Sequence, residues 1–432
     1  MQEHLDEAAF HWRQRERALA SWEESLEEVA EGDEARLLAH VEGLVIGGAP
    51  VAKRLLLPAL EGEDLWQVGP AALALLESEG AASLVLLLRG LTEGPEESRP
   101  EIRRAFELAD RSRFEALLLP QVARVGPEAQ AMLLEVLTAW QADPGTALPR
   151  TLGADDAPAL WEAALRSARF TTRPVAEGLV RQGLAHAEDC VRCVALETGL
   201  ILGLHESWHA CRRQVGAPGE AGRLATLALA SGGEPADMRL LLEAAEASRL
   251  REDVLWALGF SGRRVAAEAL VDVMQREEAV SRLAAEAFAI ITGLDLTEHL
   301  LTDELDDEAP SSAEEGAGEM GAATGAWRVP PPPGRVRAAS VCAWWQKART
   351  RFDERGRFVR GVPWSPAAVS AELTHGPACL RPVWALELAV RTRGALQVAT
   401  TARVAFQLRQ LQGLVALRLD STLRGFDSLM TA

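Results

Sequence analysis

A repeat of about 30 residues constrains the fold of this 432-residue chain more than any other feature. The segment ALASGG (228–233) aligns with ALGFSG (257–262) at an offset of 29 residues. The glycines that close successive apolar runs follow nearly the same spacing: Gly203, Gly232, Gly262 and Gly293. Each repeat holds an apolar helix, a break and a second helix, and one such pair cannot bury its apolar faces alone. The sequence therefore predicts that neighbouring helix pairs stack on one another.

The fold class that follows is all-α. Ala, Leu, Glu and Arg dominate the chain, and these residues are strong helix formers. Hydrophobic residues make up 48% and charged residues 25%, which is typical of a chain that folds. Over residues 35–300 we expect an α-solenoid of short HEAT-like repeats, because the repeat is shorter than the usual HEAT unit. Residues 1–34 are expected to form a helical segment that caps this array.

The repeat pattern stops after Gly293, and the segment 301–334 has a different composition. Residues 303–319 contain eight acidic side chains and no basic one, and VPPPPG (329–334) follows as a stiff polyproline stretch. Such a segment cannot bury enough apolar surface to offset the entropy that ordering costs. We therefore expect a disordered, acidic and Pro-rich linker.

Residues 335–432 carry a net charge of the opposite sign. They hold fifteen Arg and Lys against six Asp and Glu, a net charge of +9, so the overall charge of −18 leaves −27 on residues 1–334. Amphipathic runs at 365–373, 383–394 and 401–413 begin or end at Ser, Pro or Gly, as helices do. The sequence predicts a small basic helical C-terminal domain that the linker joins to an acidic array.

The stretch HESWH (205–209) has the H-E-x-x-H pattern of zinc-dependent hydrolases. On a helix, His205 and His209 lie one turn apart and could share a zinc ion, with Glu206 as the general base. Two observations oppose this hypothesis: the chain supplies no third ligand at a usual spacing, and the motif begins two residues after the repeat glycine Gly203. We interpret the stretch as the start of a repeat helix, and we expect no metal, no cofactor and no catalytic residue.

A second metal pattern uses the same histidines. Cys190, Cys193, His205 and His209 have a spacing close to that of a zinc finger. If residues 188–202 form a single helix, Cys193 and His205 lie about 18 Å apart along its axis. Zinc holds its ligands at about 2.0–2.3 Å from the metal. The helical interpretation instead makes both cysteines small buried side chains.

The basic segment 335–361 is a candidate for nucleic-acid binding, because aromatic side chains lie among its arginines. The arginines that would line such a surface are Arg349, Arg351, Arg355, Arg357 and Arg360. A strongly acidic chain is repelled by phosphate unless its basic face is well separated. We favour an interpretation in which the aromatic residues form a core and the arginines pair with acidic residues elsewhere in the chain.

Targeting signals are not evident in the sequence. The amino-terminal residues are charged and amphipathic and lack the apolar stretch of a secretory signal. No uncharged apolar run approaches the length of about 20 residues that spans a bilayer. The five cysteines, an odd number, do not suggest a disulfide framework. These features favour a cytoplasmic location without membrane association.

Three segments of the chain carry a resemblance: HLDEAAFHWRQRERAL (4–19), DEARLLAHVEGLVIGGAPVAKRLLLPAL (33–60) and GPACLRPVWALELAVRTRG (376–394). They are similar to a family of uncharacterised bacterial proteins with HEAT-like repeats, and the likeness covers nearly the whole chain. Members are often encoded near type VI secretion genes, which implies an accessory or adaptor role. The resemblance brings no assigned catalytic residues.

The function that these patterns favour is protein binding. We expect a non-enzymatic scaffold or adaptor that presents a helical surface to a partner, with a secretion component or its cargo as the partner that the resemblance implies. Two alternatives stay open. One is a zinc-dependent hydrolase centred on His205, Glu206 and His209, and the other is a nucleic-acid binder that uses the arginines of 335–361.

Limited proteolysis tests the expected division of the chain. Because the linker has a composition that does not favour ordered structure, a protease should cleave first within 303–334 and leave two resistant fragments. The products are identified by mass spectrometry. First cleavage within 190–290 would contradict the repeat assignment.

Overall fold

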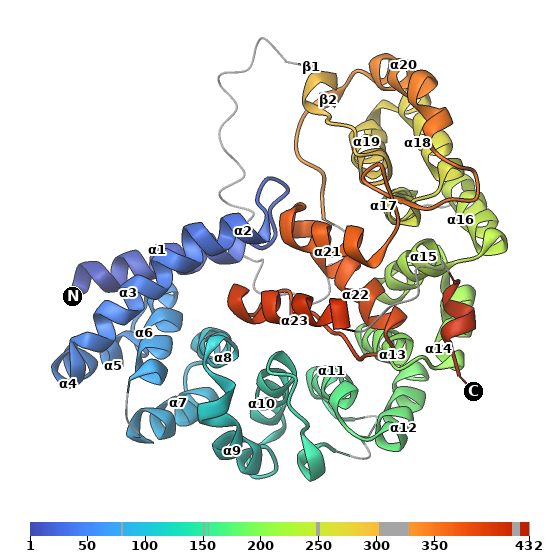
Figure 1. Cartoon of the computed structure of the whole chain (residues 1–432). Coiled ribbons are helices and arrows are strands. Elements are labelled where there is room, and N and C mark those ends of the chain that lie inside the picture. The colour runs from blue at the N-terminus through green and yellow to red at the C-terminus, as the bar shows by residue number, and fades with distance from the viewer. Residues whose placement is uncertain are drawn as a thin grey trace. The chain divides into compact units, whose positions relative to one another are not determined.

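The structure, a computed structural model, describes residues 1–78, 81–149, 152–153, 155–247, 251–301, 327, 329–416 and 424–431. The described part is built of helices with two short antiparallel strand pairs (Figure 1), so the all-α prediction is confirmed. The chain divides into two compact units. Unit 1 comprises Met1–Ser207 and Ser370–Leu419, and unit 2 comprises Trp208–Val369 and Asp420–Ala432.

Unit 1 begins with three helices that pack on one another: α1 (Gln2–Ala18), α3 (Ala35–Ile46) and α6 (Leu65–Glu77). Helix α1 is amphipathic, and Leu5 and Trp12, two turns apart, belong to its buried face. Shorter elements connect these helices: α2 (Leu26–Val29), the π-helix η1 (Ala30–Glu34), α4 (Gly48–Val51), the π-helix η2 (Ala52–Leu56) and α5 (Leu57–Ala59). Ser25 and Glu28 form a capping box, which fixes where α2 begins.

A row of helices then follows in unit 1, in which each helix packs on the next (Figure 1): α6, α8 (Arg99–Leu108), α10 (Pro127–Ala139), α11 (Pro158–Ser167) and α13 (Asp189–Ile201). Three further helices lie between them in the chain and pack against the row: α7 (Ala81–Glu93), α9 (Arg111–Val122) and α12 (Arg173–Leu184). One hydrophobic cluster extends from Leu5 to Leu204 along this row.

The same hydrogen bond recurs between neighbours in the row. The Ser167 hydroxyl donates to the Leu134 carbonyl at 2.9 Å, and the Thr198 hydroxyl donates to the Leu165 carbonyl at 3.1 Å. Both bonds span 33 residues, so equivalent positions of successive helices make the same contact. This periodic contact is the structural counterpart of the repeat in the sequence.

Unit 2 contains a second row, in which α15 (Glu220–Gly232), α17 (Arg251–Ser261) and α19 (Glu278–Thr292) pack in order. Helices α16 (Pro235–Ala247) and α18 (Arg264–Arg276) pack against this row, and α20 (Ala338–Ala348) packs on α18. Two helices contain the unit boundaries, α14 (His205–Gln214) and α21 (Pro366–His375).

The remaining short 3₁₀ turns are η3 (Glu96–Ser98), η4 (Gly145–Ala147), η5 (Ala168–Phe170), η6 (Thr297–His299), η8 (Arg349–Arg351), η9 (Ala378–Leu380) and η10 (Phe426–Leu429).

The repeat glycines end helices in two different ways. Gly262 and Gly293 have φ values of 63° and 70°, a left-handed conformation that favours glycine at the end of a helix. Gly203 has the same conformation, with φ 72°. Gly232 is instead the last residue of α15, and a Cβ atom there would lie 2.0 Å from Cγ of Phe426. The glycine at this repeat therefore makes room for an aromatic ring of the C-terminal segment.

The ends of the expected linker lie side by side within unit 2. Strand β1 (Leu300–Leu301) pairs antiparallel with β2 (Arg335–Val336). Trp327 is buried, and its carbonyl accepts a hydrogen bond of 2.7 Å from the Trp256 indole. The expected disordered linker falls largely on residues 302–326 and 328, which lie outside the described residues. Both flanks of the segment therefore belong to the same unit, whereas the sequence predicted that the segment joins two domains.

The C-terminal residues 335–432 do not form one compact unit. Residues 335–369 belong to unit 2 and residues 370–419 belong to unit 1, where α22 (Arg381–Arg391) packs on α13 and α23 (Val404–Ala416) packs on α2 and η1. A small hydrophobic cluster joins Val404 to Ala18, Leu26 and Val29. The structure thus divides the chain differently from the expected boundaries at residues 34, 300 and 334, because the C-terminal helices bury their apolar faces against the amino-terminal ones.

The length and the apolar content of a helix decide whether it could cross a membrane. Among the described helices, none is both long enough and apolar enough to cross a bilayer alone. One pair, Leu26–Ile46 and Gly48–Ala59, meets that criterion of length and composition only when its two parts are taken together across a bend of 103°.

The structure changes the expected result of proteolysis. A chain cut within 302–326 should keep its two fragments associated in native buffer, because β1 still pairs with β2 and residues 370–416 remain packed in unit 1. Size-exclusion chromatography of the cut protein checks this, followed by denaturing electrophoresis of the eluted peak. Fragments that separate without denaturant would contradict the assignment of residues 370–416 to unit 1.

Candidate functional site

A buried ion pair anchors the amino-terminal helix in unit 1. Arg15 of α1 is 1% exposed, and its Nε atom donates to the carboxylate of Glu34 at 2.8 Å. The Nη2 atom of Arg15 donates to two carbonyl oxygens of the C-terminal segment, those of Thr401 at 3.1 Å and Ala402 at 2.9 Å. The guanidinium therefore joins α1 to a segment more than 380 positions later in the chain.

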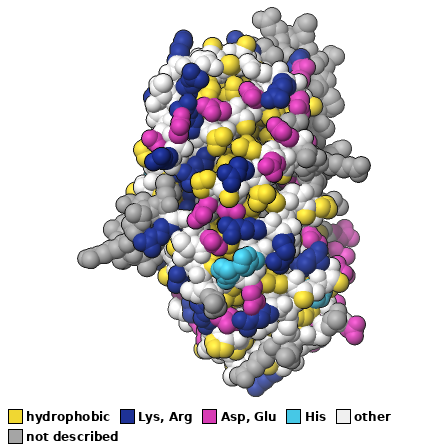
Figure 2. Space-filling view, turned by 90° about the vertical axis from the view of Figure 1, so that its right-hand side faces the viewer, with side chains coloured by type: hydrophobic (Ala, Val, Ile, Leu, Met, Phe, Trp, Pro, Cys, Tyr) yellow, Lys and Arg dark blue, Asp and Glu magenta, His cyan; other side chains and the backbone are white. Residues whose placement is uncertain are grey.

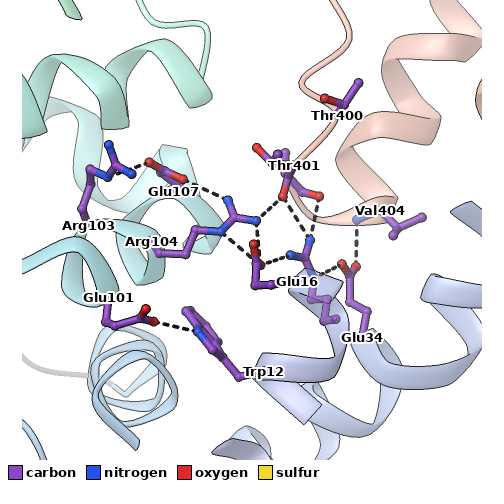
Figure 3. A network of polar contacts seen from close by, with 12 residues as sticks. Trp12, Glu16, Glu34, Glu101, Arg103, Arg104, Glu107, Thr400, Thr401 and Val404 are labelled. Atoms are coloured by element: carbon purple, nitrogen blue, oxygen red, sulfur yellow. Dashed lines mark hydrogen bonds and ion pairs between the residues drawn. The ribbon is translucent and has the colours of Figure 1, made fainter. Parts of the chain in front are cut away.

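A second arginine completes the polar network that Figure 3 shows. Arg104 of α8 donates to Glu16 at 2.9 Å and to Glu107 at 2.9 Å, and also to the carbonyl of Thr401 at 2.6 Å. Glu16 in turn accepts from Arg15 at 2.7 Å. We call Arg15, Glu16, Glu34, Arg104 and Glu107 the arginine–glutamate network. Its members come from α1, η1 and α8.

Glu34 also caps the amino-terminal end of helix α23, which is distant from it in the sequence. One carboxylate oxygen pairs with Arg15, and the other accepts a hydrogen bond of 2.8 Å from the backbone N–H of Val404, the first residue of α23. A carboxylate at this position satisfies a backbone donor that the helix itself leaves unpaired. It also interacts favourably with the positive end of the helix dipole. Glu34 thus acts as the amino-terminal cap of α23.

The charges of the network stabilise one another. Burial alone would raise the pKa of the Glu16 carboxyl, but Arg104 and Arg15 outweigh burial and hold that pKa below its usual value. Burial likewise opposes the charge on Arg104, yet the carboxylates of Glu16 and Glu107 raise the pKa of its guanidinium. Both groups are therefore charged at neutral pH, and the network is a structural anchor in which each charge has its partners.

The face of α1 opposite this anchor presents an exposed apolar patch. Asp6, Phe10 and Arg13 share one face of α1 because they lie four and three residues apart. Asp6 accepts from the Gln67 side chain at 3.1 Å, and the Arg13 guanidinium carbon lies 5.6 Å from the centroid of the Trp66 ring. Phe10, between these two contacts, is 44% exposed, and Leu65 and Trp66 are each 38% exposed. We call Phe10, Leu65 and Trp66, with Asp6 and Arg13 at their edge, the α1–α6 patch.

The composition of the α1–α6 patch is typical of a protein-binding surface. Aromatic side chains and arginine are enriched where proteins contact one another, and they contribute most of the binding free energy. Exposed apolar side chains that lie together with polar groups at their rim mark interaction sites in many proteins. The α1 side of the patch is also held in position, because the arginine–glutamate network anchors the opposite face of α1.

The residues of HESWH lie where a repeat helix was predicted, at the start of α14. Ser207, Trp208 and Cys211 form its buried face, whereas Glu206 and His209 are exposed. Arg181 donates to both carboxylate oxygens of Glu206, at 3.1 and 3.2 Å. The carboxylate that a zinc-dependent hydrolase would use as its general base is therefore engaged in an ion pair.

Cys190 and Cys193 both lie on helix α13, as the helical interpretation predicts. Cys193 is buried and Cys190 is half-buried. Burial, followed by a hydrogen bond to Glu162, raises the pKa of the Cys190 thiol to about 11. Because zinc binds the thiolate, this environment does not favour a zinc finger.

The five arginines of the predicted basic surface do not share one environment. Arg349, Arg351 and Arg355 are exposed, and Arg360 is half-buried. Arg357 is 3% exposed, and its guanidinium donates to the carbonyls of Phe260 at 2.7 Å and Ser261 at 3.0 Å, at the end of α17. The prediction that Arg357 lines a binding surface is therefore wrong, since its side chain caps a helix.

The strands that follow Arg357 cover two helix ends. The hairpin β3 (Phe358–Val359) and β4 (Val362–Pro363) donates backbone hydrogen bonds of 2.8 Å from Phe358 to Gly262 and from Arg360 to Ile290. The basic segment thus completes the row α17–α19. On the face drawn in Figure 2, Lys and Arg side chains are interspersed with Asp and Glu, with hydrophobic side chains between them.

Comparison with known proteins adds no identification: no family model, no curated protein and no solved structure matches the chain.

Sequence reasoning did not single out the residues of the α1–α6 patch or the network. Asp6, Phe10 and Arg13 lie at helical spacing, and that pattern could have identified an exposed aromatic residue on α1. No local pattern marks Glu34 as the cap of α23, because its partner Val404 lies 370 residues away. Such a pairing is visible only in the folded chain.

The substitution Arg104→Met tests the anchoring role of the network. It leaves Glu16 with fewer compensating charges, so we expect a loss of about 3 kcal/mol in the free energy of unfolding, the low end for a broken buried pair. The low end applies because the Glu16 side chain is 30% exposed. Denaturant unfolding followed by circular dichroism measures the change. Arg89→Met is the matched control, since the exposed Arg89–Glu93 pair should contribute under about 0.5 kcal/mol.

The pH dependence of that loss supplies a second readout. The folded-state pKa of Glu16 is lowered from 4.5, so the stability that its charge contributes is present above pH 4.5 and lost as the pH falls through the folded-state pKa. The difference between the wild type and Arg104→Met should therefore shrink on acidification below pH 4.5. An equal difference at pH 7 and pH 4 would contradict the electrostatic origin of the effect.

Proposed function

We propose that the protein is a non-enzymatic scaffold or adaptor that binds other proteins through surfaces of stacked helix pairs. The observation that carries the proposal is the α1–α6 patch, in which Phe10 and Trp66 are exposed aromatic residues and α1 is held in place by a buried network. A rigid surface loses little conformational entropy on binding, so its aromatic side chains contribute fully to affinity. A partner with an apolar segment fits the chemistry of the patch.

The arrangement of each unit as a row of helices supports a solenoid of short HEAT-like repeats. In unit 1 each helix of the row packs on the next, and the hydroxyl contacts at Ser167 and Thr198 repeat with the same span. Repeat arrays of this kind expose extended surfaces to partners. The resemblance to bacterial proteins encoded near type VI secretion genes makes a component or cargo of such a system the first partner to test.

Neither alternative function has a specific observation in its favour. A hydrolase at HESWH would need Glu206 to accept a proton, and that carboxylate accepts two hydrogen bonds from Arg181. A nucleic-acid binder would need the arginines of 335–361 on one accessible face, and Arg357 is buried against α17. Protein binding without catalysis and a cytoplasmic location remain parts of the proposal.

Affinity capture tests the proposal. The tagged protein should retain specific partners from lysate of its native cell, and the double variant Phe10→Ala/Trp66→Ala should retain at least about tenfold less of them. Quantitative mass spectrometry measures the recovery. Leu240→Ala is the matched control, because Leu240 is 40% exposed and lies in unit 2. Equal recovery by the double variant and the control would assign binding to another surface and refute the role of the patch.

A further inference from the structure

Three histidines and one glutamate gather at the contact between α1 and α3. His4, Glu7 and His11 lie three and four residues apart on α1, so they form one stripe along that helix. His40 meets this stripe from α3. We call these four residues the histidine cluster. It lies in unit 1 and shares no residue with HESWH.

The separations among three of the four residues are those of groups that can bind one ion together. Glu7, His11 and His40 each offer one ligand atom, and these atoms lie within 4.8 Å of one another. The Nδ1 atoms of His4 and His40 are 3.1 Å apart. Ligand atoms in a tetrahedral zinc site are about 3.4 Å apart, since each lies about 2.1 Å from the metal. Because Glu7 is exposed, a change of its rotamer can close the remaining distance.

The Asp33 carboxylate orients the ring of His11. His11 is 7% exposed, and its Nδ1 atom lies 2.8 Å from the Asp33 carboxylate. A carboxylate in this position fixes the tautomer of a histidine and leaves Nε2 for a metal, an arrangement that metal-binding histidines commonly have. The pairing of a buried ring with a carboxylate therefore points to a prepared ligand.

The contact between the helices leaves room for the other rings. A Cβ atom on Gly43 of α3 would lie 3.1 Å from two atoms of the His4 ring, so the glycine lets this ring approach closely.

We propose that Glu7, His11 and His40, with His4 as the fourth ligand, bind a divalent transition-metal cation, and that this cation is zinc. Imidazole nitrogen and carboxylate oxygen are ligands that zinc accepts in a four-coordinate site. The ion would fasten α1 to α3, since it takes ligands from both helices. The inference does not depend on the proposed function, and it differs from the expectation from the sequence that the chain binds no metal.

Zinc titration of the full-length protein tests the site. After treatment with a chelator and its removal, isothermal titration calorimetry with zinc chloride should show one equivalent bound, and the midpoint of thermal unfolding should rise. His40→Ala and Glu7→Gln should each weaken zinc binding at least about tenfold, and Asp33→Asn about tenfold. Glu7 is exposed, so Glu7→Gln keeps the test valid if His40→Ala does not fold, which circular dichroism reports.

The double variant His205→Ala/His209→Ala is the matched control, because it removes the same number of histidines from the other candidate metal site. It should bind zinc as tightly as the wild type does. Zinc that leaves the titration curve and the unfolding temperature of the wild type unchanged would overturn the proposal. So would binding that persists in Glu7→Gln and His40→Ala but disappears in the control, since that result would place the metal at HESWH.

Discussion

The contact between Arg15 and Glu34 is the interaction on which the rest of unit 1 depends. A buried guanidinium and a buried carboxylate are tolerated only if every charge keeps its partners, because removing one leaves the other uncompensated. The carbonyls of Thr401 and Ala402 and the N–H of Val404 supply the remaining partners. The C-terminal segment therefore supplies hydrogen-bond partners that the buried charges require where α1 meets η1. In the same unit Arg381, 1% exposed, donates to the carbonyl of Leu373 at 2.8 Å and to the Gln407 side chain.

This constraint explains how one helix can carry the buried anchor and both of the proposed sites. The buried face of α1 holds Trp12 and Arg15, and the Trp12 indole donates to Glu101 of α8 at 2.8 Å. With that face fixed, the rest of the helix surface presents the α1–α6 patch and the stripe of the histidine cluster in defined positions. Groups of this kind act together only when the element that carries them is rigid.

The local features of the fold could be predicted from the sequence. Apolar periodicity and glycine breaks located the helices that end just before Gly203, Gly262 and Gly293, and all three glycines adopt the left-handed conformation that ends a helix. The helix over 205–214 and the burial of Cys193 were also predicted correctly. The contacts over long sequence distances could not be predicted, because a residue such as Glu34 gives no local sign of its partner Val404. The positive charge of 335–432 suggested a separate basic domain, yet Arg357 uses its charge to cap α17.

Hydrogen exchange along a denaturant series, followed by mass spectrometry, tests most directly whether the C-terminal segment belongs to the fold of the amino-terminal helices. If the arginine–glutamate network couples them, peptides that cover α1 and peptides that cover the start of α23 should lose protection together, at one denaturant concentration. Protection of α23 that disappears well below the concentration at which α1 opens would show that the two fold independently. That result would contradict the central role assigned to Arg15 and Glu34.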